Sequence, residues 1–326
     1  MTRTNMMGRR LFAGCVLAAL SLAPLALPAF SADEGVSGGQ FLRIGVDARS
    51  SALGETGAAL SGASGLFYNP AGLAAVTGPE LFFSHARWIG DIGYSSLAFA
   101  AKRYSGVVGF GISYLDCPSI DKYDKFGNDL SASYSASDAA VMLGYARRVA
   151  SRLDLGFAAK YISSRLETAN ASALALDGGL RYAAIPGKLD FGLSAQNFGG
   201  PLKFRSRSDP LPLNVRLGGA YHLPFGRDRR MHKSAAFFTD VNYLRDAGIY
   251  GNAGVEMTTS YDKGAAFSMR LGYRTAATGD SSGISAGLGM DMSSYLIDYA
   301  YSPMGDLGNT HRVSVTVRFG RRSRGF

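Results

Sequence analysis

The sequence contains only two cysteines, and its histidines are few and dispersed. Cys15 lies in an amino-terminal segment that we expect to be removed, so Cys117 would be the single cysteine of the mature chain. One cysteine cannot form an intramolecular disulfide, a redox pair or a cysteine metal site. The four histidines stand far apart and at no metal-ligand spacing: His85, His222, His232 and His311. We therefore expect no metal ion and no other cofactor.

The mature part of the chain also lacks a long apolar run. No segment after residue 32 reaches the roughly 18 to 20 unbroken apolar residues that a membrane-spanning helix requires. If this chain crosses a membrane, it must do so as a closed β-barrel, because only closure satisfies every backbone polar group in lipid.

The one long apolar segment, residues 11–27, has the features of an export signal. Residues 3–10 before it are basic, and residues 28–32 after it end in small side chains. We predict a signal peptide over residues 1–31, cleaved after Ser31 or Ala32. The alternative is a single-helix anchor, which Pro24 and Pro28 disfavour because they interrupt the apolar run.

Acidic residues are fewer than basic ones, and the formal charge is +9. Loss of Arg3, Arg9 and Arg10 with the signal leaves +6. Nucleic-acid binding would require these charges to cluster on one face with aromatic residues between them. Here they are spread over turns, a short tail at 321–326 and alternate strand positions. The charge therefore predicts a polar lumen and solvated turns, with no nucleic-acid partner.

From residue 80 onwards the chain alternates apolar with small or polar residues in segments of about ten, separated by turns rich in Gly, Asn, Asp or Pro. Residues 310–320 show this most clearly, because odd positions from Val313 to Phe319 are apolar and even positions from Arg312 to Arg318 are polar. Side chains of a strand alternate between two faces, so one face suits hydrocarbon and the other suits water. This pattern predicts an all-β fold, a transmembrane antiparallel β-barrel of about 14 strands.

The strands are predicted at 80–88, 92–102, 106–115, 138–148, 153–165, 172–184, 188–198, 212–222, 234–244, 249–258, 264–274, 283–292, 294–302 and 310–320. A soluble antiparallel sandwich could also alternate. Aromatic residues near strand ends, cationic residues on inward positions and the export signal favour the barrel.

Residues 32–79 lack sustained alternation and form a separate predicted unit before the barrel at 80–320. Asn69 and Pro70 suit the cap and first turn of a short helix. This unit either crosses the lumen as a plug or hangs in the periplasm. Longer loops are predicted at 116–137, 199–211, 225–233 and 303–309, and we expect 116–137 to be an extracellular element that contacts a partner.

Two stretches resemble the PorV/PorQ family of outer-membrane proteins. The first consists of residues 41–49 (FLRIGVDAR), 52–58 (ALGETGA) and 67–73 (FYNPAGL), and the second is the closing hairpin 298–312 (DYAYSPMGDLGNTHR). The resemblance implies a FadL-like barrel of fourteen strands with an amino-terminal plug. Some members of that family serve type IX secretion, and the wider FadL group moves hydrophobic molecules through a lateral opening.

The matching motifs supply the candidate site residues. In the plug these are Asn69, Pro70 and Gly72, for which we expect a structural role. In the closing hairpin they are Asp298, Tyr299, Tyr301, Gly305, Gly308, His311 and Arg312. We expect Asp298 to face the lumen and to pair with Arg312, and we expect both tyrosines to face lipid.

Three functions are compatible with these features, and each places the chain in the outer membrane of a diderm bacterium, in contact with its lipid. The main interpretation is a non-enzymatic barrel that binds secreted proteins or an attachment complex. The alternative is a transporter of hydrophobic small molecules such as long-chain fatty acids, which predicts an apolar pocket between plug and wall with a strand break beside it. An open diffusion pore is the third, and the plug argues against it.

Overall fold

The structure is a computed structural model that describes residues 37–204, 207–228, 230–262, 264–275, 282–304 and 308–320. Residues 33–326 form one compact unit, which contains all of these residues. The predicted signal peptide, its cleavage site and the predicted tail at 321–326 lie outside the described residues. Among the described residues, no helix has the length and apolar character needed to span a membrane.

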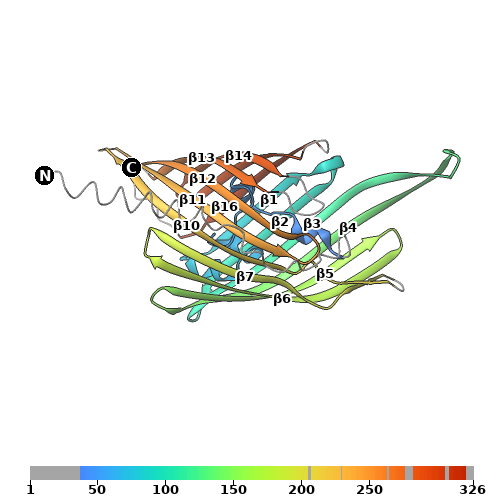
Figure 1. The fold of residues 1–326 in the computed structure, drawn as a ribbon, viewed down its shortest axis with the longest axis horizontal. Helices are drawn as coiled ribbons and strands as arrows, with labels where there is room; N and C mark the ends of the chain where they lie inside the picture. The colour runs from blue at the N-terminus through green and yellow to red at the C-terminus, as the bar shows by residue number, and fades with distance from the viewer. Residues whose placement is uncertain are drawn as a thin grey trace. The chain divides into compact units, whose positions relative to one another are not determined.

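Fourteen antiparallel strands close into a barrel in the order β1-β16-β15-β14-β13-β12-β11-β10-β7-β6-β5-β4-β3-β2 (Figure 1). The strands are β1 (Glu80–Arg87), β2 (Gly93–Arg103), β3 (Gly106–Tyr123), β4 (Asp129–Ala150), β5 (Leu153–Leu166), β6 (Ala169–Ile185), β7 (Leu189–Gly199), β10 (Asn214–Arg227), β11 (Met231–Leu244), β12 (Gly248–Tyr261), β13 (Ala265–Arg274), β14 (Gly283–Met292), β15 (Tyr295–Pro303) and β16 (Asn309–Arg318). Each predicted strand overlaps one of these, so the predicted fold is confirmed.

Strands β1 and β16 close the barrel, with Glu80 opposite Arg318 and Arg87 opposite His311. Strand β7 pairs directly with β10, so the chain between them leaves the wall. There β8 (Leu202–Phe204) and β9 (Arg207–Asp209) form a small hairpin of their own. Leu202 and Leu211 of this excursion are buried. The excursion therefore packs onto the protein as a cap.

The two faces of the wall differ as the alternation predicts. On β13, Met269 is 68% exposed whereas the neighbouring Arg270 is 6% exposed. The outward faces of the strands carry mainly leucine, valine, phenylalanine, methionine and tyrosine. A continuous outward surface of this kind is typical of a barrel in contact with hydrocarbon.

The two ends of the barrel have different connections. At one end, which we call the short-turn end, every connection is two or three residues long: 104–105, 151–152, 186–188, 228–230, 262–264 and 293–294. The predicted long loop at 225–233 is therefore wrong, because β10 and β11 extend into it. The opposite end, the long-loop end, carries the excursion after β7 and the connections at 88–92, 124–128, 275–282 and 304–308, together with two short ones at 167–168 and 245–247.

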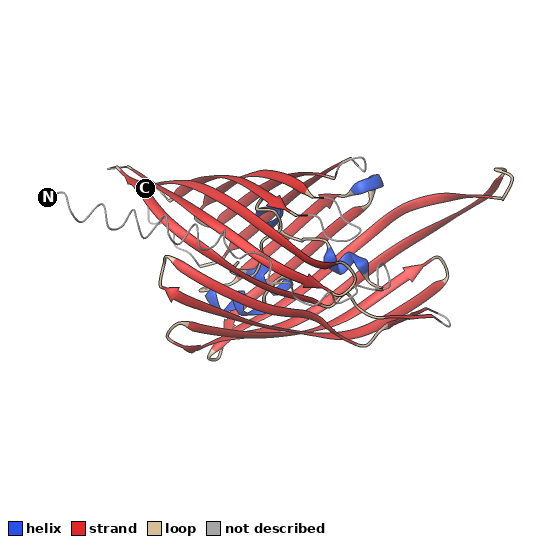
Figure 2. Ribbon diagram, viewed as in Figure 1, coloured by secondary structure: helices blue, strands red, loops and turns tan. Residues whose placement is uncertain are grey.

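The predicted loop 116–137 is wrong over most of its length. Strand β3 runs on to Tyr123 and β4 begins at Asp129, and their hairpin projects beyond the others (Figure 2). Residues 131–137 alternate serine with alanine or tyrosine, so one face is apolar but consists mostly of alanine. With so little apolar surface, the period-two signal of a strand is weak although the backbone pairing forms.

The amino-terminal segment lies inside the ring of strands (Figure 2). It contains the 3₁₀ helices η1 (Gln40–Arg43), η2 (Ala63–Phe67) and η3 (Pro70–Ala75) and the helix α2 (Ala48–Ala52), while η4 (Ile89–Asp91) joins β1 to β2. Helix α2 packs against β13 to β16, and η2 and η3 pack against β1 to β6. The segment thus crosses the lumen, and we call residues 37–79 the plug.

Candidate functional site

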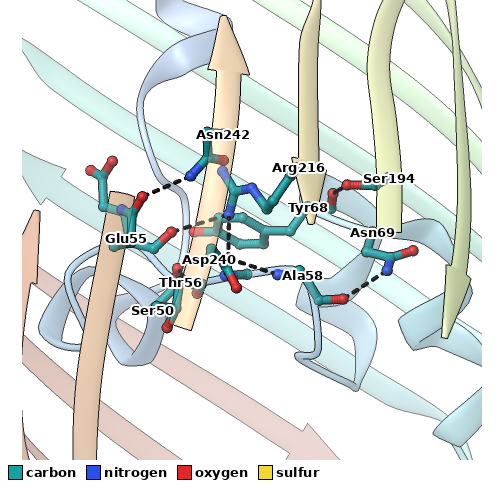
Figure 3. A network of polar contacts seen from close by, with 12 residues as sticks. Ser50, Glu55, Thr56, Ala58, Tyr68, Asn69, Ser194, Arg216, Asp240 and Asn242 are labelled. Carbon is teal, nitrogen blue, oxygen red and sulfur yellow. Dashed lines mark hydrogen bonds and ion pairs between the residues drawn. The ribbon is translucent and has the colours of Figure 1, made fainter. Parts of the chain in front are cut away.

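A network of buried polar contacts fixes the plug to the wall (Figure 3). Asp240, on the inner face of β11, accepts hydrogen bonds from the backbone N–H groups of Gly57 at 2.6 Å and Ala58 at 3.0 Å. Nη1 of Arg216, on β10, lies 3.6 Å from the same carboxylate. Because these donors share one buried carboxylate, withdrawing this part of the plug would leave a buried charge with fewer partners, which is costly.

Tyr68 links two parts of the plug to the wall. Its hydroxyl accepts hydrogen bonds from the N–H groups of Val46 at 2.8 Å and Asp47 at 2.9 Å. The Arg216 guanidinium lies over its ring, 5.5 Å from the centroid, and the Ser194 hydroxyl donates to its carbonyl at 2.9 Å. Burial raises the pKa of Tyr68 to about 12, so the hydroxyl is uncharged at neutral pH.

A second anchor is made of ion pairs on the neighbouring part of the wall, from β12 to β15. Arg49 of α2 contacts Glu256 of β12 at 2.8 Å, and Arg270 of β13 contacts the same carboxylate at 2.6 Å. Arg270 also contacts Asp298 of β15 at 2.7 Å. We call Arg49, Glu256, Arg270 and Asp298 the charge clamp. It joins one plug helix to three strands.

The predicted plug motif caps a helix. Pro70 begins η3, and the Asn69 side chain accepts a hydrogen bond from the N–H of Ala71 at 3.1 Å. The Asn69 amide also donates to the carbonyl of Leu180 on β6 at 3.0 Å. A Cβ on Gly72 would lie under 3.0 Å from the Leu60 carbonyl oxygen, so only glycine fits there. All three residues make contacts that hold the plug together.

Glycines on the inner wall allow the plug to approach the strand backbone. A Cβ at any of them would lie under 3.0 Å from a plug atom: Gly156, Gly179 and Gly192 on β5 to β7, and Gly254, Gly272 and Gly287 on β12 to β14. Real Cβ atoms do not tolerate such contacts, so side chains at these positions would push the plug away.

A pair of adjacent glycines on β6 tests this close packing. Gly179 faces Asn69 inside the barrel, whereas a Cβ on Gly178 would have its nearest neighbour, Phe157, at 3.9 Å. We expect Gly179→Ala to lower the free energy of unfolding by about 1–3 kcal/mol and to raise solute conductance, because the capped helix must shift. Gly178→Ala is the matched control and should change neither quantity in chemical denaturation and planar-bilayer recordings. Equal behaviour of the two variants would contradict the close packing.

The closing-hairpin residues do not form one site. Asp298 is buried in the charge clamp, whereas Tyr299 and Tyr301 lie on the outward face of β15, as predicted. The Tyr299 hydroxyl lies 2.8 Å from Nδ1 of the exposed His311, and the Tyr301 ring packs against the same imidazole at a tilt of 57°. Gly308 adopts a positive φ of 100° in the turn, and Gly305 lies outside the described residues.

The predicted pair of Asp298 with Arg312 is wrong. In the register of β15 and β16, Asp298 stands opposite Ser314, and Arg312 stands opposite Ala300. The carboxylate of Asp298 instead reaches across the inner face to Arg270. Two residues that are both inward on adjacent strands need not be directly opposite each other.

Arg312 is the one member of the closing hairpin with an unusual environment. It is 4% exposed, its guanidinium lies over the ring of Tyr94 at 5.8 Å, and its Nη1 has no hydrogen-bond partner. Arg216 and Arg270, which are equally buried, each contact a carboxylate. Within the described part of the chain, no acidic side chain forms an ion pair with Arg312. A buried charge of this kind favours an anionic partner.

An apolar cluster lies between the plug, the wall and the cap. We call it the mouth cluster, and its largest buried members are Phe41, Val46, Tyr68, Tyr94, Leu115, Ile162, Leu202 and Leu211. Below it, a cavity of about 40 Å³ is lined by Leu42, Ile44, Phe67, Met142 and polar side chains of β5, β7 and β10. A cavity that binds benzene has roughly 150 Å³, so this one is too small for an aromatic ring. The route beside the plug is closed.

The wall is irregular beside this cavity. Strands β6 and β7 shift register between Leu176 and Gly178, and Asn197 has a positive φ of 62°. Gln196 and Asn197 both face inward, which identifies a β-bulge. Asn197 accepts a hydrogen bond from Lys160 at 2.7 Å, and its N–H donates to Asp177 at 2.8 Å. The wall defect is therefore closed by polar side chains.

A larger cavity of about 400 Å³ lies on the other side of the plug, toward the short-turn end. Its lining includes Asp47, Arg49, Glu80, Asp298 and Arg318. These charged groups make it a polar vestibule, unlike the mouth cluster. An apolar molecule would find no favourable path along the barrel axis here.

Residues 283–287 (GISAG) match the Gly-x-Ser-x-Gly pattern of hydrolase nucleophiles. Ser285 lies on the inner face of strand β14, and its hydroxyl accepts a hydrogen bond from the N–H of Gly54 at 3.1 Å. A nucleophile elbow requires a strand-to-helix turn, which this strand does not provide. Ser285 therefore anchors the plug.

Sequence reasoning missed the partners of the plug, namely Asp240, Glu256 and Arg270. The available signal was a charged residue at an inward position of an alternating strand, since such a charge must find a partner in the lumen. The mouth cluster was also missed, because its members come from the plug, β2, β3, β5 and the cap.

No protein-family model matches the sequence, and no curated protein matches it. Solved structures do match in fold. The chain is similar to the toluene transporter TodX of P. putida (TM-score 0.58, 14% identity, 85% of this chain and 99% of that chain). It is also similar to the toluene transporter TbuX of Ralstonia pickettii (0.57, 14%, 84% and 98%) and to a Pseudomonas aeruginosa FadL homologue (0.54, 10%, 84% and 98%).

The fold is thus a FadL-like, fourteen-stranded barrel with an amino-terminal plug. At 10–14% identity the likeness establishes the fold alone. The resemblance to PorV/PorQ proteins gains no support from a family match and stays a prediction.

Proposed function

We propose that this chain is a non-enzymatic outer-membrane barrel that moves hydrophobic small molecules, such as long-chain fatty acids, into the membrane. The observation that carries the proposal is the mouth cluster, which meets a closed cavity between plug and wall beside a β-bulge. The transporter alternative predicts an apolar pocket beside a strand break; the apolar mouth cluster and the bulge support it, although polar side chains line much of the cavity. The solved structures of similar fold include two toluene transporters, which favours this alternative over the secretion interpretation.

The two ends of the lumen differ in polarity, and this difference indicates the direction in which a hydrophobic molecule would move. Apolar side chains line the approach from the long-loop end, whereas charged side chains line the vestibule at the short-turn end. Short turns face the periplasm in bacterial barrels, so the apolar approach faces outward. A hydrophobic molecule would enter at the mouth cluster and leave sideways near Asn197 rather than pass through the charged vestibule.

Arg312 supplies a partner for a carboxylate on such a molecule. Its guanidinium lies over Tyr94, which belongs to the mouth cluster. A hydrogen bond to a charged group contributes about 1.5–3 kcal/mol, which corresponds to roughly tenfold to a hundredfold in affinity. We therefore expect Arg312→Gln to weaken binding of a fatty acid by at least about tenfold while binding of toluene is unchanged.

The affinity of purified protein for each ligand measures this difference. It is determined by displacement of a bound fluorescent fatty acid and of bound labelled toluene. Arg87→Gln, on the exposed face of the adjacent strand β1, is the matched control and should affect neither ligand. Equal losses for both ligands in Arg312→Gln would show that the residue supports the fold and does not bind the carboxylate.

A second candidate function is the binding of secreted proteins or an attachment complex. The observation in its favour is the projecting β3–β4 hairpin, which exposes Ile120, Tyr123, Phe126 and Leu130. Exposed apolar side chains beyond the barrel wall are a feature of protein-binding surfaces.

Mass spectrometry of protein purified from outer membranes in mild detergent separates the two functions. A discrete fatty acid or hydrocarbon, extracted in stoichiometric amount without a protein partner, is the result that hydrophobic transport predicts. Stoichiometric secreted or attachment-complex proteins, lost when residues 120–130 are replaced by a short turn, would overturn it in favour of the second candidate.

A further inference from the structure

Cationic side chains gather on one side of the short-turn end. They lie at the ends of β2 and β4 and on the turns that follow β4 and β6, and all are exposed: Lys102, Arg103, Arg147, Arg148, Arg152 and Lys188. The strands that carry them are neighbours in the barrel, so these turns form a continuous stretch of its rim. We call this set the basic arc.

The basic arc has almost no compensating negative charge. Asp154 is the nearest acidic residue along the chain, and it is buried in an ion pair with Arg148 at 2.7 Å. Asp190 is buried and contacts Arg181. In the described residues of the turns after β2, β4 and β6 and the strand ends beside them, no exposed carboxylate is present. Five cations of the arc are therefore exposed without an acidic partner.

The basic arc lies at the border of the apolar surface. Leu143, Tyr145 and Arg147 are alternate residues on the outward face of β4. Leu143 and Tyr145 are exposed apolar side chains, and Arg147 comes next toward the rim. The Arg103 guanidinium stacks over the ring of Tyr104, which is 95% exposed. Aromatic rings mark the level of the lipid headgroups in membrane barrels. The cations thus stand at the depth of the headgroups.

The rest of the same rim has a different composition. The turn after β10 includes Asp228, and the turn after β12 includes Asp262, which lies 3.4 Å from His232. Both carboxylates are exposed. The turn after β10 and the start of β11 also carry the exposed cations Arg230 and Lys233, but these lie beside Asp228. Exposed cations without an exposed carboxylate beside them are therefore found on the side formed by β2 to β7.

We propose that the basic arc binds the headgroups of anionic phospholipids in the leaflet around the short-turn end. Each headgroup presents a phosphodiester, which guanidinium and ammonium groups pair with well. The contact would hold one side of the barrel at a fixed depth. This inference goes beyond transport. Of the proposed function, it rests only on the statement that the chain is a barrel in the outer membrane.

The test compares lipids retained by the protein after reconstitution into nanodiscs of phosphatidylcholine and phosphatidylglycerol in equal amounts. Native mass spectrometry of protein released from the discs measures the retained lipids. We expect the wild type to retain phosphatidylglycerol severalfold over phosphatidylcholine, and we expect high salt to remove the preference. The variant with Lys102→Gln, Arg103→Gln, Arg147→Gln, Arg152→Gln and Lys188→Gln should lose most of this preference.

The matched control carries Lys122→Gln, Lys125→Gln and Arg165→Gln near the long-loop end, and it should keep the wild-type preference. No preference in the wild type, or an unchanged preference in the arc variant, would overturn the proposal. If the arc variant does not fold, the salt dependence of the wild type decides. Uptake of a fatty acid by cells that express the same variants is measured separately, so loss of transport and loss of lipid preference are distinguished.

Discussion

A disulfide between cysteines introduced at Gly38 and Leu202 should abolish uptake of hydrophobic molecules. A Cβ on Gly38 would lie 3.2 Å from the Cβ of Leu202, close to the 3.5–4.5 Å of a disulfide. The N–H of Gly38 already donates to the carbonyl of Pro210 at 2.9 Å. The bond would fasten the beginning of the plug to the cap over the mouth cluster. Since the 40 Å³ cavity must enlarge before a ligand can pass, the locked protein should be inactive.

The measurement is uptake of a labelled fatty acid by cells expressing the double variant in a Cys117→Ser background. Oxidised cells should show only background uptake, and a reductant should restore it. Cys117→Ser alone and each single cysteine variant are the controls, and these should take up the label at the wild-type rate. Wild-type uptake by protein shown to be fully cross-linked would mean that the route does not pass under the cap.

The largest loss of stability is expected for Arg270→Met in the charge clamp. The guanidinium contacts Glu256 at 2.6 Å and Asp298 at 2.7 Å, and all three side chains are buried. Removal of one partner leaves buried carboxylates uncompensated, which typically costs about 3–5 kcal/mol. Glu256 keeps Arg49, whereas Asp298 loses its ion pair with Arg270. Guanidinium denaturation followed by the β-sheet circular dichroism signal measures the change.

The control is Arg87→Met, which removes the exposed ion pair of Arg87 with Asp91. Exposed pairs contribute about 0–1 kcal/mol, so this variant should unfold almost as the wild type does. Adding Asp298→Asn to Arg270→Met should recover part of the loss, since the uncompensated charge is then gone. A loss below about 1 kcal/mol for Arg270→Met would show that the charge clamp does not hold the plug.

The barrel could be predicted because its signal is local. In β13 and β16 every second residue is apolar, and that alternation survives any change in register. The β3–β4 hairpin was not predicted because the apolar face of residues 131–137 consists of two alanines and a tyrosine, which is a weak signal. Backbone pairing with β3, beyond the barrel, holds it in strand conformation.

The site could be predicted only where its contacts join residues that are close together in the sequence. Asn69 and Pro70 identify a helix cap by themselves, and η3 begins at Pro70. The contact of Arg270 with Asp298 depends on the registers of β13, β14 and β15 together, so no spacing in the sequence reveals it. The expectation that Asp298 pairs with Arg312 considered one hairpin and not its other neighbours.

Uptake by cells tests the central claim most directly. A strain without its own transporter for long-chain fatty acids would express this chain or carry an empty vector, and would be given a labelled fatty acid and labelled toluene. Uptake of the fatty acid well above the vector level, competed by unlabelled ligand, is the predicted result. Uptake at the vector level, from protein shown to be folded in the outer membrane, would contradict hydrophobic transport.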